Sequence, residues 1–278
     1  MKSDNRIDIQ VNSHIEHKIL EQKGYSIHYF ISGKNPNDLI MFLHPAFGNH
    51  RCFDKQIDFF SENYRVITLD FLGHGLSQPG STKDKIDISL NHIQKIMENE
   101  RYDNAHFVGV SMGSLIAQYM ALKNPDMVKS ITILGGYDIN SDNRKVMKAQ
   151  KAEGVKWIFK ALYSMKSFRR YVASVTVVHD EEKARFYEMA SLFTRRSFRV
   201  MSGLGKIIQP RDNVQHNYPL LVMTGDQDLE LIKKVAEDWK KNDPCIEFQI
   251  IPNAGHCANM DNADSFNAIL ADFLVKDN

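Results

Sequence analysis

The sequence has few cysteines, and their arrangement excludes two kinds of protein. Cys52, Cys245 and Cys257 are the 3 cysteines among 278 residues, too few for a disulfide-stapled secreted scaffold. Neither His50 near Cys52 nor His256 next to Cys257 belongs to a larger set of ligands, so we expect no metal site. Scarce thiols are typical of a reducing compartment, and we expect a cytoplasmic protein.

An excess of charge of one sign is also absent. The chain carries 35 Lys and Arg against 34 Asp and Glu, a formal net charge of +1. That is too little for a general field that attracts nucleic acid or anionic membranes, so we expect no nucleic-acid partner. Two local basic clusters, in residues 166–170 and 195–199, are interpreted as solvated helix faces.

Long apolar runs are missing as well. Residues 1–6 are polar and lead into no apolar stretch, which predicts neither a signal peptide nor a membrane span. A hydrophobic fraction of 43% and a charged fraction of 25% are typical of a globular chain with a sizeable core. We expect one main domain, and the oligomeric state stays open.

What the sequence does contain is a rhythm of short apolar runs, most of them separated by stretches long enough for a helix. This alternation predicts an α/β fold with a mostly parallel eight-stranded sheet flanked by helices. The first two runs flank Gly24 as a hairpin, and the later runs are apolar throughout, as in strands buried on both faces. The predicted strands are residues 15–20, 26–32, 39–43, 65–69, 106–110, 130–134, 220–224 and 246–251.

The pattern of short apolar runs is interrupted after the sixth predicted strand. Residues 137–209 are rich in Lys, Arg, Met, Phe and Tyr at helical spacing, which predicts a helical cap inserted into a core made of residues 1–136 and 210–278. A separate helical domain is the alternative. The aromatic side chains of the insertion are expected to pack more often than to line a pocket. They include Trp157, Phe159, Tyr163, Phe168, Tyr171, Phe186, Tyr187 and Phe193.

The sharpest local motif is Gly109-Val110-Ser111-Met112-Gly113, between a predicted strand and a predicted helix. A sharp strand-to-helix turn leaves no room for side chains two residues on either side of a nucleophile, hence the glycines. The turn exposes the Ser111 hydroxyl at the start of a helix, where a developing negative charge is stabilised. A simple glycine-flanked turn is the alternative. The predicted strand before the motif and the predicted helix after it favour the catalytic interpretation.

A serine hydroxyl needs a base and an orienting acid. His256 is the candidate base, because it follows the last predicted strand on a loop. The acid fixes the imidazole tautomer and stabilises the imidazolium. Asp228 is the first choice and Asp226 the alternative, since both follow the strand 220–224; either could instead cap the next helix.

With the order serine, aspartate, histidine, the chain resembles the α/β-hydrolase fold family, in its esterase and lipase-like branch, from Gly24 to the C-terminus except in the cap. Residues 43–48, Leu-His-Pro-Ala-Phe-Gly, resemble the family's oxyanion loop, and residues 70–77 resemble the loop after the next strand. The family's acid usually lies three residues after the glycine that ends its strand, which favours Asp228.

The resemblance also implies an oxyanion hole. Its donors would be the backbone N–H groups of Ala46 and Met112, with Phe47 as an alternative. Pro45 departs from the family's usual glycine and has no N–H to donate.

These residues predict a serine hydrolase that cleaves a small ester, thioester, lactone or amide through an acyl-enzyme on Ser111, with no metal or organic cofactor. The expected partner is a small-molecule acyl substrate. Cleavage of a carbon–carbon bond and elimination of a small acid are alternatives on the same triad. A third is a small-molecule sensor without activity. Serine at position 111 disfavours chemistry that uses an acidic nucleophile.

Overall fold

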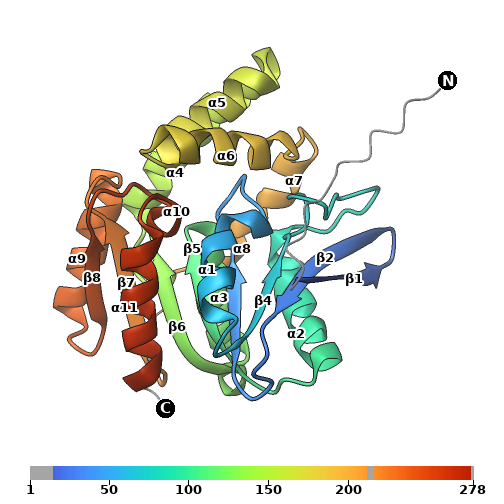
Figure 1. Cartoon of the computed structure of the whole chain (residues 1–278). Helices are drawn as coiled ribbons and strands as arrows, with labels where there is room; N and C mark the ends of the chain where they lie inside the picture. The colour runs from blue at the N-terminus through green and yellow to red at the C-terminus, as the bar shows by residue number, and fades with distance from the viewer. Residues whose placement is uncertain (1–14, 212–215, 277–278) are drawn as a thin grey trace.

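One sheet of eight strands forms the centre of the molecule (Figure 1). The structure, a computed structural model, describes residues 15–211 and 216–276; the predicted polar start at residues 1–6 lies outside the described residues. The strand order is β1-β2-β4-β3-β5-β6-β7-β8. The strands are β1 (Glu16–Gln22), β2 (Tyr25–Ser32), β3 (Leu39–Leu43), β4 (Arg65–Leu69), β5 (Ala105–Val110), β6 (Val128–Leu134), β7 (Leu220–Gly225) and β8 (Glu247–Ile251).

The pairing of the strands confirms the predicted fold class. β1 and β2 form an antiparallel hairpin around Gly24, which has a φ of +89°, and β2 also pairs antiparallel with β4. All other neighbouring strands are parallel. The chain therefore forms a mostly parallel eight-stranded sheet within an α/β fold, as the apolar rhythm predicts.

Helices cover both faces of the sheet (Figure 1). α2, α3 and α9 pack against one face, and α1 and α11 pack against the other. The helices are α1 (Asp54–Phe60), α2 (Ser89–Glu100), α3 (Met112–Lys123), α4 (Arg144–Tyr163), α5 (Met165–Thr176), α6 (Asp180–Ser191), α7 (Ser197–Met201), α8 (Leu204–Ile207), α9 (Glu230–Asn242), α10 (Ala258–Asp261) and α11 (Ala263–Lys276). Short 3₁₀ turns are η1 (His50–Phe53), η2 (Ile86–Ile88) and η3 (Pro125–Met127).

The two cores explain why the central strands are apolar at every position. In β3, Leu39 and Met41 belong to one core and Ile40 and Phe42 to the other, because successive side chains point to opposite faces. The expectation of strands buried on both faces is wrong for β8. It is an edge strand, and its residues Gln249 and Ile250 are exposed.

The strand order reverses direction beside β3. The chain continues from β3 to β4 on one side and later to β5 on the other, and open α/β sheets bind ligands where the order reverses in this way. Leu43 at the end of β3 pairs with Gly109 near the end of β5. The loops after β3 and β5 therefore lie side by side, and the loops after β6, β7 and β8 continue along the same edge.

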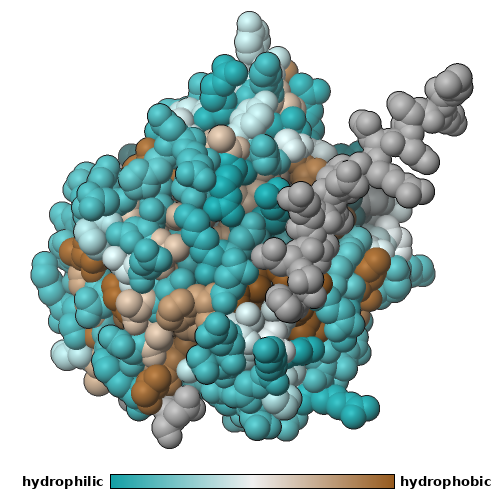
Figure 2. All heavy atoms as spheres, in the orientation of Figure 1, coloured by the Kyte–Doolittle hydropathy of each residue, from teal (hydrophilic) through white to brown (hydrophobic). Residues whose placement is uncertain are grey.

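Between β6 and β7 the described residues form the helices α4 to α8. Figure 1 shows α4 to α7 gathered along one side of the molecule, at the top of the view. In the described ranges no helix is both long and apolar enough to cross a membrane. The face seen in Figure 2 is mostly hydrophilic.

Most aromatic side chains of this segment pack, as expected. Phe168, Phe186 and Phe193 are fully buried. Phe159 and Tyr163 are different, because 68% and 90% of their surfaces are exposed. For these two the packing expectation is wrong, since they lie on a face of α4 that no described helix covers.

Candidate active site

Ser111 occupies a strained turn between β5 and α3. Its φ of 50° and ψ of −113° lie outside the regions that non-glycine residues usually adopt. The Ser111 N–H donates to the Leu134 carbonyl at 2.8 Å, and the Ser114 hydroxyl donates to the Ser111 carbonyl at 2.6 Å. These bonds hold the backbone in place. The side chain is partly exposed, while the turn residues on either side are buried.

The glycines around this turn have the steric role that the motif predicts. A Cβ on Gly109 would lie 2.5 Å from the backbone of Ser114, and a Cβ on Gly113 would lie 1.9 Å from the Leu43 carbonyl oxygen. Both distances are far below a normal contact. The end of β3 can therefore approach the start of α3 only because position 113 has no side chain.

His256 and Asp228 meet although they leave different strands. Asp228 follows β7 and His256 follows β8, and His256 Nδ1 lies 2.9 Å from Asp228 Oδ1. The Asp228 carboxylate is fully buried, while 16% of the His256 side chain is exposed. With Nδ1 donating to the carboxylate, Nε2 is left free to accept a proton.

The electrostatic surroundings raise the pKa of His256. Burial is the largest influence and lowers the pKa, but the charge of Asp228 and its hydrogen bond outweigh it together. The net result is a pKa above the ordinary value of 6.5. An imidazolium at this position is therefore stabilised by Asp228.

Asp226 has a different neighbourhood. Its side chain is exposed and accepts a hydrogen bond from the Ala254 N–H at 3.0 Å. Bonds from backbone N–H groups, that of Ala254 first, lower the pKa of Asp226. The structure thus joins Asp228 to the histidine and uses Asp226 to hold the loop that precedes it.

The candidate oxyanion residues Ala46 and Phe47 lie in the loop after β3, and the third candidate, Met112, begins α3. The Gly48 N–H donates to the Pro45 carbonyl at 3.2 Å and closes a turn around Ala46 and Phe47. Met112, the first residue of α3, has an N–H without a partner inside the helix. Ala46 and Phe47 line the same cavity as Ser111.

Phe47 has an unusual backbone for a bulky residue, with a φ of 69°. The strain is offset by packing, since only 5% of the residue is exposed. Aromatic rings from the helical segment after β6 contact its ring edge-on, with centroids 4.9 to 5.2 Å away: Trp157, Phe168 and Phe193. The helical segment therefore packs directly on the turn that presents Ala46.

Two buried residues, His44 and Asp70, organise the loops near the site. His44 Nε2 accepts the Phe71 N–H at 3.0 Å and so joins the loops after β3 and β4. Asp70 accepts the N–H groups of His50 and Leu76 at 2.8 and 2.7 Å. Burial lowers the pKa of His44 to about 4, so this imidazole is neutral near pH 7.

Ser111 and His256 line one cavity of about 170 Å³. Its walls come from the loops after β3 and β6 and from α3, α4, α5 and the start of α9, and most of them are apolar. Gln150, Glu153 and Thr176 add polar groups. Within the described residues no hydrogen bond joins His256 to Ser111, and such bonds commonly tighten only when substrate binds.

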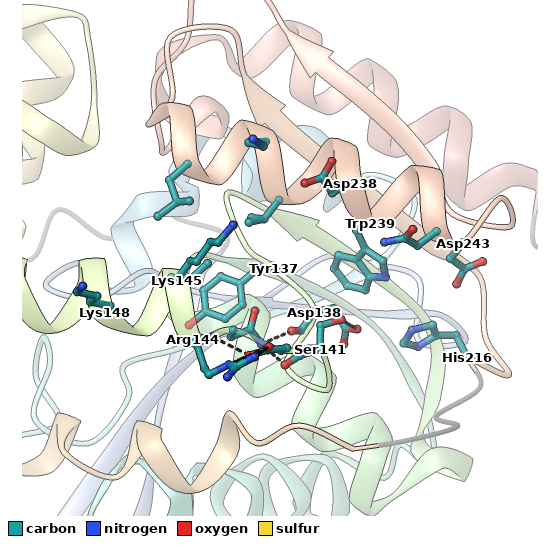
Figure 3. Close-up of a pocket in the computed structure, with 17 residues that line it drawn as sticks. Tyr137, Asp138, Ser141, Arg144, Lys145, Lys148, His216, Asp238, Trp239 and Asp243 are labelled. Carbon is teal, nitrogen blue, oxygen red and sulfur yellow. Dashed lines mark hydrogen bonds and ion pairs between the residues drawn. The ribbon is translucent and has the colours of Figure 1, made fainter.

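A larger open hollow of about 960 Å³ lies next to this cavity, between α4 and α9 (Figure 3). It shares Tyr137, Val146 and Leu231 with the cavity but does not contain Ser111. Its walls carry charges of both signs, among them Lys145 and Asp238.

Several features of the site do not follow from the sequence patterns considered above. Gly135, with a φ of +62°, lies against the imidazole, and a Cβ there would come 2.9 Å from His256 Nδ1. The glycine pair 135–136 directly after a strand is the signal that could have revealed this close approach. The sequence contains no comparable signal for the position of Glu153 in the cavity wall or for the ring contacts of Phe47.

The sequence is similar to those of known proteins. A family model described as alpha/beta hydrolase fold matches residues 38–263. A 2-hydroxy-6-oxononadienedioate/2-hydroxy-6-oxononatrienedioate hydrolase from Pseudomonas sp is 26% identical, with 90% of this chain and 92% of the relative covered. Epoxide hydrolase 3 of Xenopus tropicalis is 22% identical and covers 96% of this chain and 80% of the relative.

A solved structure has a similar fold. It comes from work on carboxylesterases of the thaumarchaeon Nitrososphaera gargenis and superposes with a TM-score of 0.76 at 16% identity, covering 94% of this chain and 98% of that chain. At this identity the likeness shows a shared fold. The family match spans most of the sheet and every loop described above, and the chain therefore belongs to the alpha/beta hydrolase fold family and is a hydrolase.

Proposed function

We propose that this enzyme is a serine hydrolase that cleaves small, neutral carboxylic esters or related thioesters, lactones or amides through an acyl-enzyme on Ser111. The observation that supports this most is the shared cavity of Ser111 and His256, with His256 held by Asp228 at 2.9 Å. A nucleophile, a base and an orienting acid are the groups that acyl transfer needs.

In the proposed reaction, Ser111 Oγ attacks the carbonyl carbon while His256 Nε2 takes the hydroxyl proton. The backbone N–H groups of Met112 and Ala46 stabilise the oxyanion. The intermediate collapses, the bond to the leaving group breaks, and His256 protonates that group. Water then attacks the acyl-enzyme while His256 takes one of its protons. The bond between the acyl carbon and Ser111 Oγ breaks, the carboxylic acid leaves, and His256 returns the proton to Ser111 Oγ.

We also propose that residues 137–209 act as a cap on a core of residues 1–136 and 210–278. Trp157 of α4 and Val172 of α5 complete the cavity that contains Ser111. The rings that contact Phe47 belong to the same segment. The cap therefore helps to shape both the acyl pocket and the oxyanion loop.

The cavity favours a short acyl group. Its 170 Å³ is well below the roughly 300 to 1,000 Å³ of pockets that hold drug-sized ligands. Among the described residues that line it, none is Lys or Arg, whereas Glu153 supplies a carboxylate. A neutral acyl group fits this lining better than an anionic one.

Carbon–carbon bond hydrolysis is the second candidate, and the Pseudomonas relative favours it. That relative's name describes a substrate with two carboxylates and a ketone. An enzyme acting on such a compound would need cationic partners for the carboxylates. The cavity offers Glu153 instead, which is why we place the ester first.

A panel of 4-nitrophenyl esters from acetate to palmitate tests the proposal. We expect the highest kcat/KM for short acyl chains and, by intact-protein mass spectrometry, a transient acyl group on Ser111. A 2-hydroxy-6-oxo-dienoate measured in parallel should be a poor substrate. Rapid turnover of that ketone without ester hydrolysis would replace the proposal by the second candidate.

The raised pKa of His256 predicts how activity depends on pH. The base must be neutral, so kcat/KM should rise with pH, with a midpoint above 6.5. The same shift affects stability in the opposite sense: the stabilisation from protonated His256 is complete below pH 6.5 and is lost as the pH rises through the raised value. A pH profile of kcat/KM with its midpoint below 6.5 would contradict this assignment.

Glu153→Gln should change the preference between neutral and anionic acyl groups. Bonds from Lys156 first and then Tyr171 lower the pKa of Glu153, so it carries a negative charge at pH 7. Removing that charge should raise kcat/KM for 4-nitrophenyl hemisuccinate by roughly three- to tenfold. The neutral butyrate ester is the control and should change by less than about twofold. Equal changes for both esters would show that Glu153 does not select on charge.

The cysteines agree with the proposed reducing, cytoplasmic location. All of them are free in the structure, and Cys52 and Cys257 are buried. Burial raises the pKa of the Cys52 thiol to about 12, which keeps it protonated and unreactive.

A further inference from the structure

The outer face of α4 exposes a continuous apolar stripe. Val155, Ile158, Phe159 and Leu162 follow one another at the i, i+3, i+4, i+7 spacing that places side chains on one face of a helix. Between 50% and 68% of each residue's surface is exposed. Tyr163 at the end of the helix is 90% exposed. Scattered apolar residues are normal on a surface, but a helical stripe of this kind marks an interaction site.

The charge around this stripe is strongly positive, although the whole chain is nearly neutral. The two helices α4 and α5 contain nine Lys or Arg and a single acidic residue, Glu153. Figure 3 shows Arg144, Lys145 and Lys148 on the first turns of α4. In the described parts of the chain, no ion pair uses the following side chains: Lys145, Lys148, Lys151, Lys166 and Arg170.

Acids face part of this group, because Lys145 and Lys148 line the hollow between α4 and α9 together with Asp142 and Asp238. Glu153 pairs with Lys156 at 2.5 Å on the same helix. In the acidic first turn of α6, Asp180 pairs with Lys183 and Glu182 with Lys55, while no ion pair among the described residues uses Glu181. Within the described ranges, Lys151, Lys166 and Arg170 have neither an ion pair nor a place in that hollow, and α4 and α5 together keep an excess of positive charge.

The stripe also lies close to the candidate active site. The opposite face of α4 contributes Val146, Gln150 and Trp157 to the cavity that contains Ser111. One helix thus has an inner face in the substrate cavity and an outer face of apolar and basic side chains. A surface bound by the outer face would lie next to the catalytic cavity.

We propose that α4 and the start of α5 dock the protein on an anionic lipid surface. A helix that combines an exposed apolar stripe with Lys and Arg lies in the interface of a bilayer, its apolar side among the acyl chains and its cations among the headgroups. The excess of positive charge on α4 and α5 favours this occupant over a second copy of the chain, because two copies would bring like charges together. The inference does not depend on the proposed function, since docking needs no catalytic residue.

A vesicle sedimentation assay tests the proposed docking. The protein is mixed with phosphatidylcholine vesicles that contain or lack phosphatidylglycerol. We expect binding to the anionic vesicles that added salt weakens, and little binding to the zwitterionic ones. Phe159→Asp with Leu162→Asp should lower the partition coefficient by roughly tenfold or more. Lys148→Glu with Lys151→Glu should lower it by a similar factor.

The matched controls change exposed apolar residues outside the cap. Ile250→Asp and Val275→Asp replace residues that are 48% and 69% exposed on β8 and α11, and they should leave vesicle binding unchanged. Ser111→Ala should bind as the wild type does, which separates docking from catalysis. Circular dichroism melts check that every variant is folded.

Three results would overturn the inference. The first is no binding of the wild type to anionic vesicles, and the second is undiminished binding of the Phe159→Asp, Leu162→Asp variant. The third is a wild-type dimer in light scattering that this variant dissociates, without vesicle binding, which would make the stripe a contact between copies of the chain.

Discussion

Replacing Ser111 with alanine should abolish ester hydrolysis, with a loss in kcat on the order of a millionfold. The hydroxyl is the proposed nucleophile, and neither His256 nor the oxyanion donors can form an acyl-enzyme without it. Steady-state hydrolysis of 4-nitrophenyl butyrate and labelling by a fluorophosphonate probe measure the loss. Labelling should disappear together with turnover.

The fold should survive this substitution. Alanine keeps the turn's backbone bonds, because the N–H and the carbonyl of residue 111 make them. Ser191→Ala, at an exposed position at the end of α6, is the control and should retain both labelling and activity. A folded Ser111→Ala variant with activity within about tenfold of the wild type would exclude the covalent mechanism.

Asp228→Asn should lower kcat by about ten-thousandfold. The amide favours the wrong histidine tautomer and cannot stabilise the imidazolium, while its size and shape are nearly unchanged. It should also reverse the pKa shift of His256. Burial still lowers the pKa, and the two influences of Asp228 that raise it are gone, so the pH midpoint of kcat/KM should fall below 6.5.

Asp226→Asn is the matched control, two residues away in the same loop. Its side chain contacts the Ala254 N–H, and an asparagine oxygen can still accept that bond. We expect kcat to change by less than about tenfold. The opposite ranking, with Asp226→Asn the more damaging change, would move the acid from Asp228 to Asp226.

The serine turn shows how much a local pattern can determine. A strand, two glycines around a serine and a following helix occupy adjacent positions in the chain. The constraint on positions 109 and 113 is steric and acts between backbone segments that the turn itself brings together. The eight apolar runs predict the sheet for a similar reason, because a strand buried on both faces must be apolar at nearly every residue.

Such local patterns do not determine which aspartate is the catalytic acid. Asp226 and Asp228 follow the same strand, and either could end a loop or cap a helix. Only the meeting of the loops after β7 and β8 distinguishes them. One carboxylate is directed at the imidazole, and the other accepts the N–H of Ala254.

The sequence by itself determined the fold class, the serine turn and the loops that carry the candidate base and acids, because each depends on residues close together in the chain. Tertiary structure decided which aspartate contacts His256, how Gly135 admits the imidazole, where Glu153 enters the cavity, and that Phe159 stays exposed while Phe168 is buried. These outcomes depend on how helices far apart in sequence pack on one another. Helical spacing shows which residues share a face, but not what covers it.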